Sequence, residues 1–161
     1  MSGKFEISRL FEAPRQRVWD AWTRPEQLAQ WLAPKGTVSD VKHFELKPGG
    51  HLHTQMTGAD GSVSWGKNIY REIDPISRLV WEQGWSNEAG DIVPPPFPMP
   101  WPRLMLTTVT FVDEGAHTRV TLTWEPIDPT EEELASFAQM LPSMTGGWTG
   151  TFDQLDAFLG A

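Results

Sequence analysis

The sequence contains no cysteine. This absence excludes disulfide bonds, thiol catalysis and cysteine-ligated zinc, and it leaves the redox compartment undetermined. Basic residues are also scarce: 13 Lys and Arg stand against 21 Asp and Glu, which gives a formal net charge of −8. Nucleic acids and anionic membrane surfaces bind positively charged proteins, so both make poor partners for this chain.

Long apolar runs are missing as well. No stretch approaches the roughly 18 continuous apolar residues of a membrane span, and the first residues lack the apolar segment of a secretory signal peptide. The sequence also has no nucleophile elbow, phosphate-binding glycine loop, dinucleotide fingerprint or HExxH motif. These absences predict a cytoplasmic protein without a recognisable catalytic or cofactor motif.

What the chain does contain is enough apolar material for one core. Its 161 residues are 39% hydrophobic, which is typical of a globular protein, and the length predicts a single domain over residues 1–161. Nine tryptophans, eight phenylalanines and 14 prolines stand out beside a single tyrosine. The central question is whether the indole rings fill the core or line a binding cavity.

The hydrophobic pattern predicts an α+β fold. A strand at residues 5–11 precedes two short helices, one on each side of Pro25. Alternating patterns and turn sequences then predict six consecutive strands, which implies an antiparallel sheet. Those strands cover residues 38–46, 51–57, 63–73, 78–85, 104–112 and 117–124.

Helices follow the last strand. Thr130 and Glu133 form the capping-box pattern of a helix start. We expect Pro142 to interrupt this helix and Gly146-Gly147 to lead into a terminal helix. The terminal helix carries an apolar stripe at Trp148, Phe152, Leu155 and Leu159.

Several stretches of the sequence resemble a known family. The first is Phe11-Glu-Ala-Pro-Arg-Gln-Arg-Val-Trp19, followed by Trp22-Thr-Arg-Pro-Glu-Gln-Leu28 and Trp31. Further matches follow in order at Pro48-Gly-Gly50, Tyr70-Arg-Glu-Ile73, Thr107-Thr-Val-Thr-Phe111, Thr118-Arg-Val-Thr121 and Gly147-Trp148. Together they resemble the activator-of-heat-shock-protein-90-ATPase-like proteins, which belong to the START-like (SRPBCC, helix-grip) superfamily.

The resemblance implies a curved antiparallel sheet that grips a long C-terminal helix, with a cavity between them. Bacterial relatives are mostly small single domains, found as monomers and homodimers. Some members bind polyketides, lipids or hormones, and a few are cyclases. The family name also suggests a chaperone-associated, stress-response interaction. Two departures from the family pattern are Asn68, where relatives usually carry glycine, and a proline-rich insertion at residues 92–102.

Histidines and acids are the candidate reactive groups. His51 and His53 share one strand face at a spacing that a metal can use. The inward face of that strand is apolar, so we expect both rings to face solvent, and His43 to lie on the surface or at a sheet edge. No third ligand is adjacent, and we expect neither a metal nor another cofactor.

Acid–base catalysis would require a carboxyl group inside the cavity with a shifted pKa. Glu72 is the candidate that lies in a family-like stretch, and Glu82 and Glu125 are further strand acids. Strand carboxylates usually face water. A cyclase- or isomerase-like enzyme that uses Glu72 is therefore an alternative to a binding protein.

Large aromatic and methionine side chains are the candidate ligand contacts. Flat, rigid rings can line a pocket for an apolar or planar molecule, and methionines adapt to irregular shapes. The alternative is that they fill an ordinary core. The predicted ligand-binding residues are Trp31, Met56, Trp81, Trp85, Trp101, Met140, Met144, Trp148 and Phe152.

The proline-rich segment, residues 92–102, contains six prolines and favours extended polyproline geometry. It is interpreted as a rigid loop without a task, as a stiff lid with Phe97, Met99 and Trp101 folded inward, or as a displayed segment for a partner protein. The apolar residues between the prolines favour packing over display.

Overall fold

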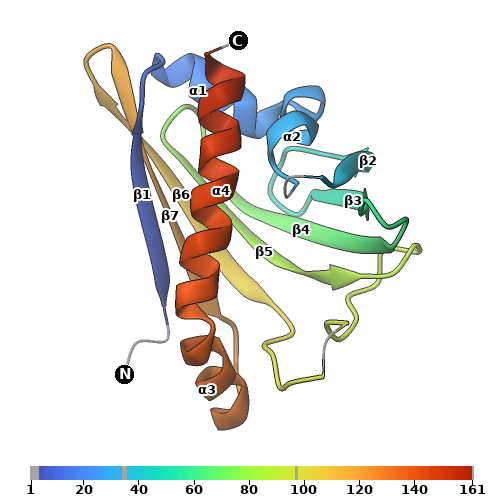
Figure 1. Ribbon diagram of the computed structural model, residues 1–161. Coiled ribbons are helices and arrows are strands. Elements are labelled where there is room, and N and C mark those ends of the chain that lie inside the picture. The colour runs from blue at the N-terminus through green and yellow to red at the C-terminus, as the bar shows by residue number, and fades with distance from the viewer. Residues whose placement is uncertain (1–3, 34–35, 97, 161) are drawn as a thin grey trace.

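A computed structural model describes residues 4–33, 36–96 and 98–160 of the chain. One curved antiparallel sheet contains all seven strands in the order β1-β7-β6-β5-β4-β3-β2 (Figure 1). The strands are β1 (Phe5–Phe11), β2 (Val38–Phe44), β3 (His51–Thr57), β4 (Val63–Asp74), β5 (Arg78–Ser86), β6 (Met105–Glu114) and β7 (His117–Pro126). The predicted α+β fold and its antiparallel strand order are confirmed.

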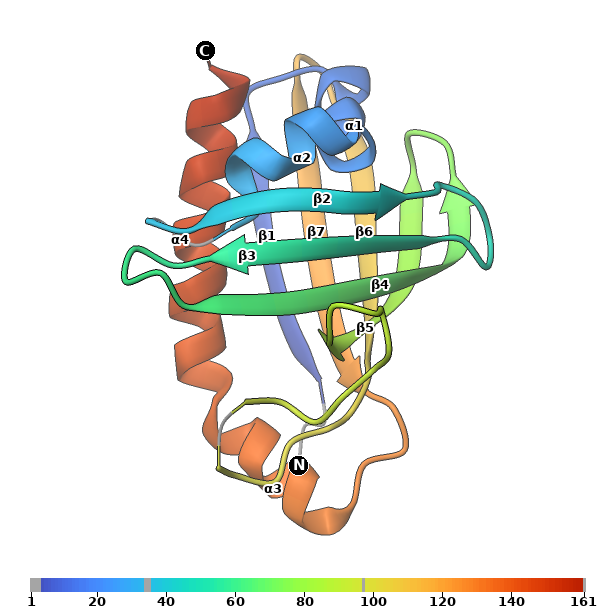
Figure 2. The same cartoon turned by 90° about the vertical axis from the view of Figure 1, so that its right-hand side faces the viewer.

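Two pairs of helices complete the fold. They are α1 (Arg15–Thr23), α2 (Pro25–Trp31), α3 (Glu131–Gln139) and α4 (Leu141–Leu159). The long helix α4 crosses the concave side of the sheet, and α2 lies between α4 and the edge strand β2 (Figures 1 and 2). The backbone of α4 comes close to β1, α1 and α2.

Local sequence explains most helix boundaries. Pro25 occupies the first turn of α2, where its missing N–H leaves no bond unmade. Thr130 accepts a hydrogen bond from the Glu133 backbone N–H, and the Glu133 carboxylate accepts one from the Thr130 N–H, so the capping box is confirmed. The predicted start of the terminal helix was wrong: α4 already begins at Leu141, because Pro142 is tolerated in a first helical turn.

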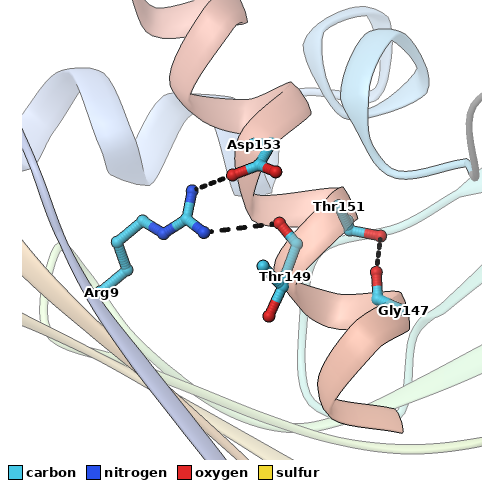
Figure 3. A network of polar contacts seen from close by, with 5 residues as sticks. All are labelled: Arg9, Gly147, Thr149, Thr151 and Asp153. Carbon is cyan, nitrogen blue, oxygen red and sulfur yellow. Dashed lines mark hydrogen bonds and ion pairs between the residues drawn. The ribbon is translucent and has the colours of Figure 1, made fainter. Parts of the chain in front are cut away.

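Arg9 of β1 fixes α4 along one side of the concave face (Figure 3). Its guanidinium donates to Asp153 Oδ1 at 2.8 Å and to the Thr149 carbonyl oxygen at 3.4 Å. The same group lies 5.8 Å from the centroid of the Phe152 ring. Charge and aromatic contacts together therefore join α4 to the β1 edge.

The segment that follows β5 turns back on that strand. Ser86 pairs with Ile92, and the Val93 N–H donates to the Trp85 carbonyl oxygen at 2.9 Å. Gly84 permits the close approach of Arg103 and Ile92 to β5, since a Cβ there would lie 2.7 Å from the Arg103 carbonyl oxygen and 3.4 Å from Ile92 Cγ2. Residues 92–96 and 98–102 then run below the sheet toward α3 (Figures 1 and 2), where Trp101 packs against Phe137 with 5.9 Å between ring centroids. Phe97, which was expected to fold inward, lies outside the described residues.

The histidines differ from the prediction in one respect. His53 does not face solvent: it is buried, stacks on Trp65, and its Nε2 lies 3.0 Å from the Asn87 carbonyl oxygen. The turn at residues 87–90 covers it, and Lys67 Nζ donates to the Gly90 carbonyl oxygen of the same turn. His43 is exposed on the edge strand β2 and stacks on His51. Within the described ranges, no group of three or more His, Asp or Glu side chains could hold a metal ion.

None of the described helices combines the length and the apolar character that crossing a membrane requires.

Candidate functional site

The concave face of the sheet has two ends that differ in burial. At the first, which we call the sealed end, five aromatic side chains from α1, α2 and the sheet pack edge to face and are at most 6% exposed. Their packing encloses the indole of Trp31, whose Nε1 donates to the Ala21 carbonyl oxygen at 2.9 Å. The sealed end consists of Trp22, Trp31, Tyr70, Trp81 and Phe111.

Three of the predicted aromatic ligand contacts are buried. Trp31 and Trp81 belong to the sealed end, and Phe152 of α4 packs against Phe11 and Trp148. These side chains therefore contribute to the packed interior of the protein.

Trp148 packs between α4 and strand β7. Its ring centroid lies 5.7 Å from that of Trp124 on β7 and 5.7 Å from that of Phe152. It is half-buried and packs against the hydrophobic core. The structure therefore places Trp148 against β7, where Trp124 is the register partner of Thr107 on β6.

The partly exposed members of the predicted set lie on β3, on β5, on the proline-rich segment and at the junction of α3 and α4, and we group them as the open end of the concave face. Met56 and Trp85 flank Gly66 on neighbouring strands: Gly66 is the register partner of Trp85, and the Met56 methyl group lies 3.5 Å from the Cβ position of Gly66. The proline-rich segment and the junction of α3 and α4 contribute Trp101 and Met140. The open end consists of Met56, Trp85, Trp101 and Met140, with Met144 as its most buried member.

Polar groups lie between the two ends. Gln83 Oε1 accepts hydrogen bonds from Trp81 Nε1 at 3.0 Å and from Thr107 Oγ1 at 2.8 Å. Asn68 is the register partner of Gln83, so its side chain projects from the same face. We call Gln83, Asn68 and Thr107 the polar floor of the site.

Sequence reasoning missed this polar floor as a binding element. A signal was present, because the alternation of β5 places Gln83 on the inner face between Trp81 and Trp85. A glutamine between two inward tryptophans must find hydrogen bonds in the interior. The sequence does not reveal its partner Thr107, which comes from a different strand.

The candidate acids do not reach the interior. Glu72 is exposed and pairs with Arg78 at 3.0 Å, so it does not supply the cavity acid that the enzyme alternative requires. Glu82 pairs with Arg71 at 2.7 Å and projects from the face opposite to Trp81 and Gln83. Glu125 is exposed, 4.0 Å from Lys4. All three carboxylates therefore lack the enclosed surroundings that acid catalysis in a cavity requires.

Two hollows lie elsewhere on the described surface. One, of about 460 Å³, lies between α2 and β2 and has charged side chains such as Glu26, Asp40 and Lys42 on its walls. The other, of about 540 Å³, follows the side of α4 that carries Gly146, Gly147 and Gly150. Neither contains a predicted ligand contact.

Comparison with known proteins supports the fold and gives the family. No curated protein matches this chain. A protein from Arthrobacter aurescens, solved by NMR, is 27% identical with a TM-score of 0.81, covering 98% of this chain and 86% of that chain. A crystal structure from Mycobacterium smegmatis is 25% identical with a TM-score of 0.77, covering 97% of this chain and 90% of that chain.

The AHSA1 protein from Silicibacter pomeroyi, at 15% identity and a TM-score of 0.73, shares the fold and covers 98% of this chain and 97% of that chain. The family model described as "Activator of Hsp90 ATPase homolog 1-like protein" matches residues 12–160. Because that match spans nearly the whole sequence, the chain belongs to the activator of Hsp90 ATPase homolog 1-like family.

Proposed function

We propose that this protein binds a small apolar or planar molecule at the open end of its concave face. One observation carries the proposal: large apolar side chains of β3, β5, the proline-rich segment and the α3–α4 junction remain partly exposed, while the aromatic side chains of the sealed end are buried. Apolar surface that is concave and faces several elements is typical of small-molecule sites.

The chemistry of the side chains supports this ligand class. Trp85 and Trp101 offer flat surfaces for stacking, and Met56 and Met140 can adjust to the shape of the molecule. A planar ligand of 13 heavy atoms that gains about 0.5 kcal/mol per atom would bind with a Kd on the order of tens of micromolar. Binding in this range would be readily measurable.

The test is a titration with 2-isopropenylnaphthalene, a planar hydrocarbon, by isothermal titration calorimetry with the protein in the syringe. We expect Trp85→Leu to weaken binding about tenfold, because it removes a stacking surface. Trp65→Leu is the matched control, since it changes another half-buried tryptophan that projects from the outer face of the sheet and stacks on His53, and its Kd should stay within about twofold of the wild type. Failure of the wild type to bind, or equal losses in the two variants, would contradict the proposal.

A further inference from the structure

The side-chain amide of Gln83 has a fixed orientation. An indole N–H can only donate, so the Gln83 atom that faces Trp81 Nε1 must be the carbonyl oxygen, Oε1. Thr107 Oγ1 donates to the same oxygen at 2.8 Å. Two donors therefore hold Oε1, and the NH₂ group of the planar amide points away from both.

This NH₂ group has no hydrogen-bond partner among the described residues, nor does the side chain of Asn68 on the neighbouring strand. Both side chains are partly accessible and share the concave face. Their register neighbours on that face, Leu52 beside Asn68 and Met105 beside Gln83, are buried and apolar. Polar groups among buried apolar neighbours destabilise the folded protein unless a hydrogen-bond partner satisfies them.

Tyr70 adds a third unpaired donor next to Asn68 on the same face of β4. Its side chain is 2% exposed, and its hydroxyl forms no hydrogen bond within the described part of the chain. Burial raises the pKa of Tyr70 above its ordinary value. The phenol therefore remains protonated and able to donate.

Cationic side chains of the neighbouring segments are engaged elsewhere. Lys67 donates to the Gly90 carbonyl oxygen on the outer face of the sheet, and Arg103 donates to the Ile92 carbonyl oxygen at 2.7 Å. A carboxylate brought to the polar floor would therefore lose hydration without gaining an ion pair. A neutral acceptor such as a ketone, ester or amide carbonyl avoids this loss.

From this geometry we infer that the ligand of the open end is a neutral carbonyl compound, whose oxygen accepts hydrogen bonds from Gln83 and Asn68 while its apolar body contacts Trp85 and Met56. The inference rests on the proposed function and adds the chemical class of the ligand to it. A hydrogen bond of this kind should strengthen binding by about three- to tenfold over a ligand that lacks the oxygen.

A matched pair of probes tests the inference. 2-Acetylnaphthalene differs from 2-isopropenylnaphthalene only by a carbonyl oxygen in place of a methylene group. We expect the ketone to bind about three- to tenfold more tightly, and to shift the Gln83 side-chain amide signals in ¹H–¹⁵N spectra, whereas the hydrocarbon should leave them nearly unchanged. 2-Naphthoate should bind more weakly than the ketone.

Two variants locate the effect. Gln83→Met should abolish the preference for the ketone and retain the affinity for the hydrocarbon. Asn68→Leu leaves the Trp81 and Thr107 hydrogen bonds intact and should reduce the preference, so it covers the case in which Gln83→Met does not fold.

Equal affinity of the wild type for the two neutral probes, tighter binding of 2-naphthoate than of the ketone, or a preference that survives both substitutions would overturn this inference and leave the proposed function standing. Absence of binding by every probe would overturn both.

Discussion

The sealed end and the open end of the concave face both contain tryptophans, and they differ in what covers these side chains. At the sealed end, α1 brings Trp22 onto Trp81 and Phe111, and α2 brings Trp31 onto Trp22. Trp22 meets Trp31 and Phe111 edge to face. At the open end, none of the described helices lies over the lower part of β3–β5, and the proline-rich segment supplies Trp101. Tryptophan content alone therefore does not distinguish core from binding surface in this fold; the placement of the helices decides.

The largest expected effect is a difference in the free energy of unfolding between substitutions at the sealed end and at the open end. Trp31→Ala should lower the free energy of unfolding by about 3–5 kcal/mol, because it leaves a cavity in a fully packed cluster. Trp85→Ala should cost markedly less, since its ring is half-exposed. Urea denaturation of both variants measures the difference. Equal losses would mean that the open end is as well packed as the sealed end, and the comparison would fail.

A second prediction concerns the segment that borders the open end. Gly84→Ala should destabilise the protein by about 1–3 kcal/mol, because the new Cβ would lie 2.7 Å from the Arg103 carbonyl oxygen and force the segment away from β5. It should also weaken binding of 2-isopropenylnaphthalene, which thermal denaturation and calorimetry would show together.

Gly147→Ala is the matched control for this change. No atom lies within 4 Å of the Cβ position of Gly147 in α4, so alanine should stabilise the helix by about 0.5–1 kcal/mol. A Gly84→Ala variant as stable as the wild type would show that the segment is not held against β5 as described.

The smallest expected effect is a pH dependence of stability that arises from His51 on the outer face of the sheet. Binding at the open end should not share it. Partial burial, followed by the charges of Lys67 and His43, lowers the pKa of His51 below its ordinary value, and Glu45 opposes this shift. As the pH is lowered through about 6.5, the unfolded chain therefore binds more protons at this residue than the native state does. The free energy of unfolding should decrease slightly as the solution becomes more acidic.

His51→Gln should flatten this slope in denaturation curves recorded between pH 5 and pH 7. The Kd for 2-isopropenylnaphthalene should stay constant over the same range, because the residues that form the open end do not titrate there. A slope that is unchanged in His51→Gln would assign the pH dependence to other groups.

Local sequence signals predicted those parts of the architecture that depend on interactions between neighbouring residues. The strand β3 has its predicted bounds because turns flank it on both sides: Gly50 must lack a side chain, since a Cβ there would lie 2.3 Å from the Glu45 carbonyl oxygen, and Gly61 has a positive φ. The capping box at Thr130 is a second example. Such signals act over a few residues and need no tertiary information.

The failures depend on contacts between distant segments. His53 is buried by a turn 34 residues away, which no alternation pattern encodes. Trp31 and Trp85 both look like inward aromatic residues in the sequence, yet α1 and α2 enclose only the first. The periodicity of an element predicts which face points inward, but not whether another element covers that face.

The most direct test of the central claim, that a small molecule occupies the open end, is a ¹H–¹⁵N spectrum of the nine tryptophan indole groups during titration with 2-isopropenylnaphthalene. The structure predicts that the signals of Trp85 and Trp101 shift, while that of Trp65, which projects from the outer face of the sheet and stacks on His53, remains in place. A shift confined to Trp65, or no shifts at saturating probe, would contradict it.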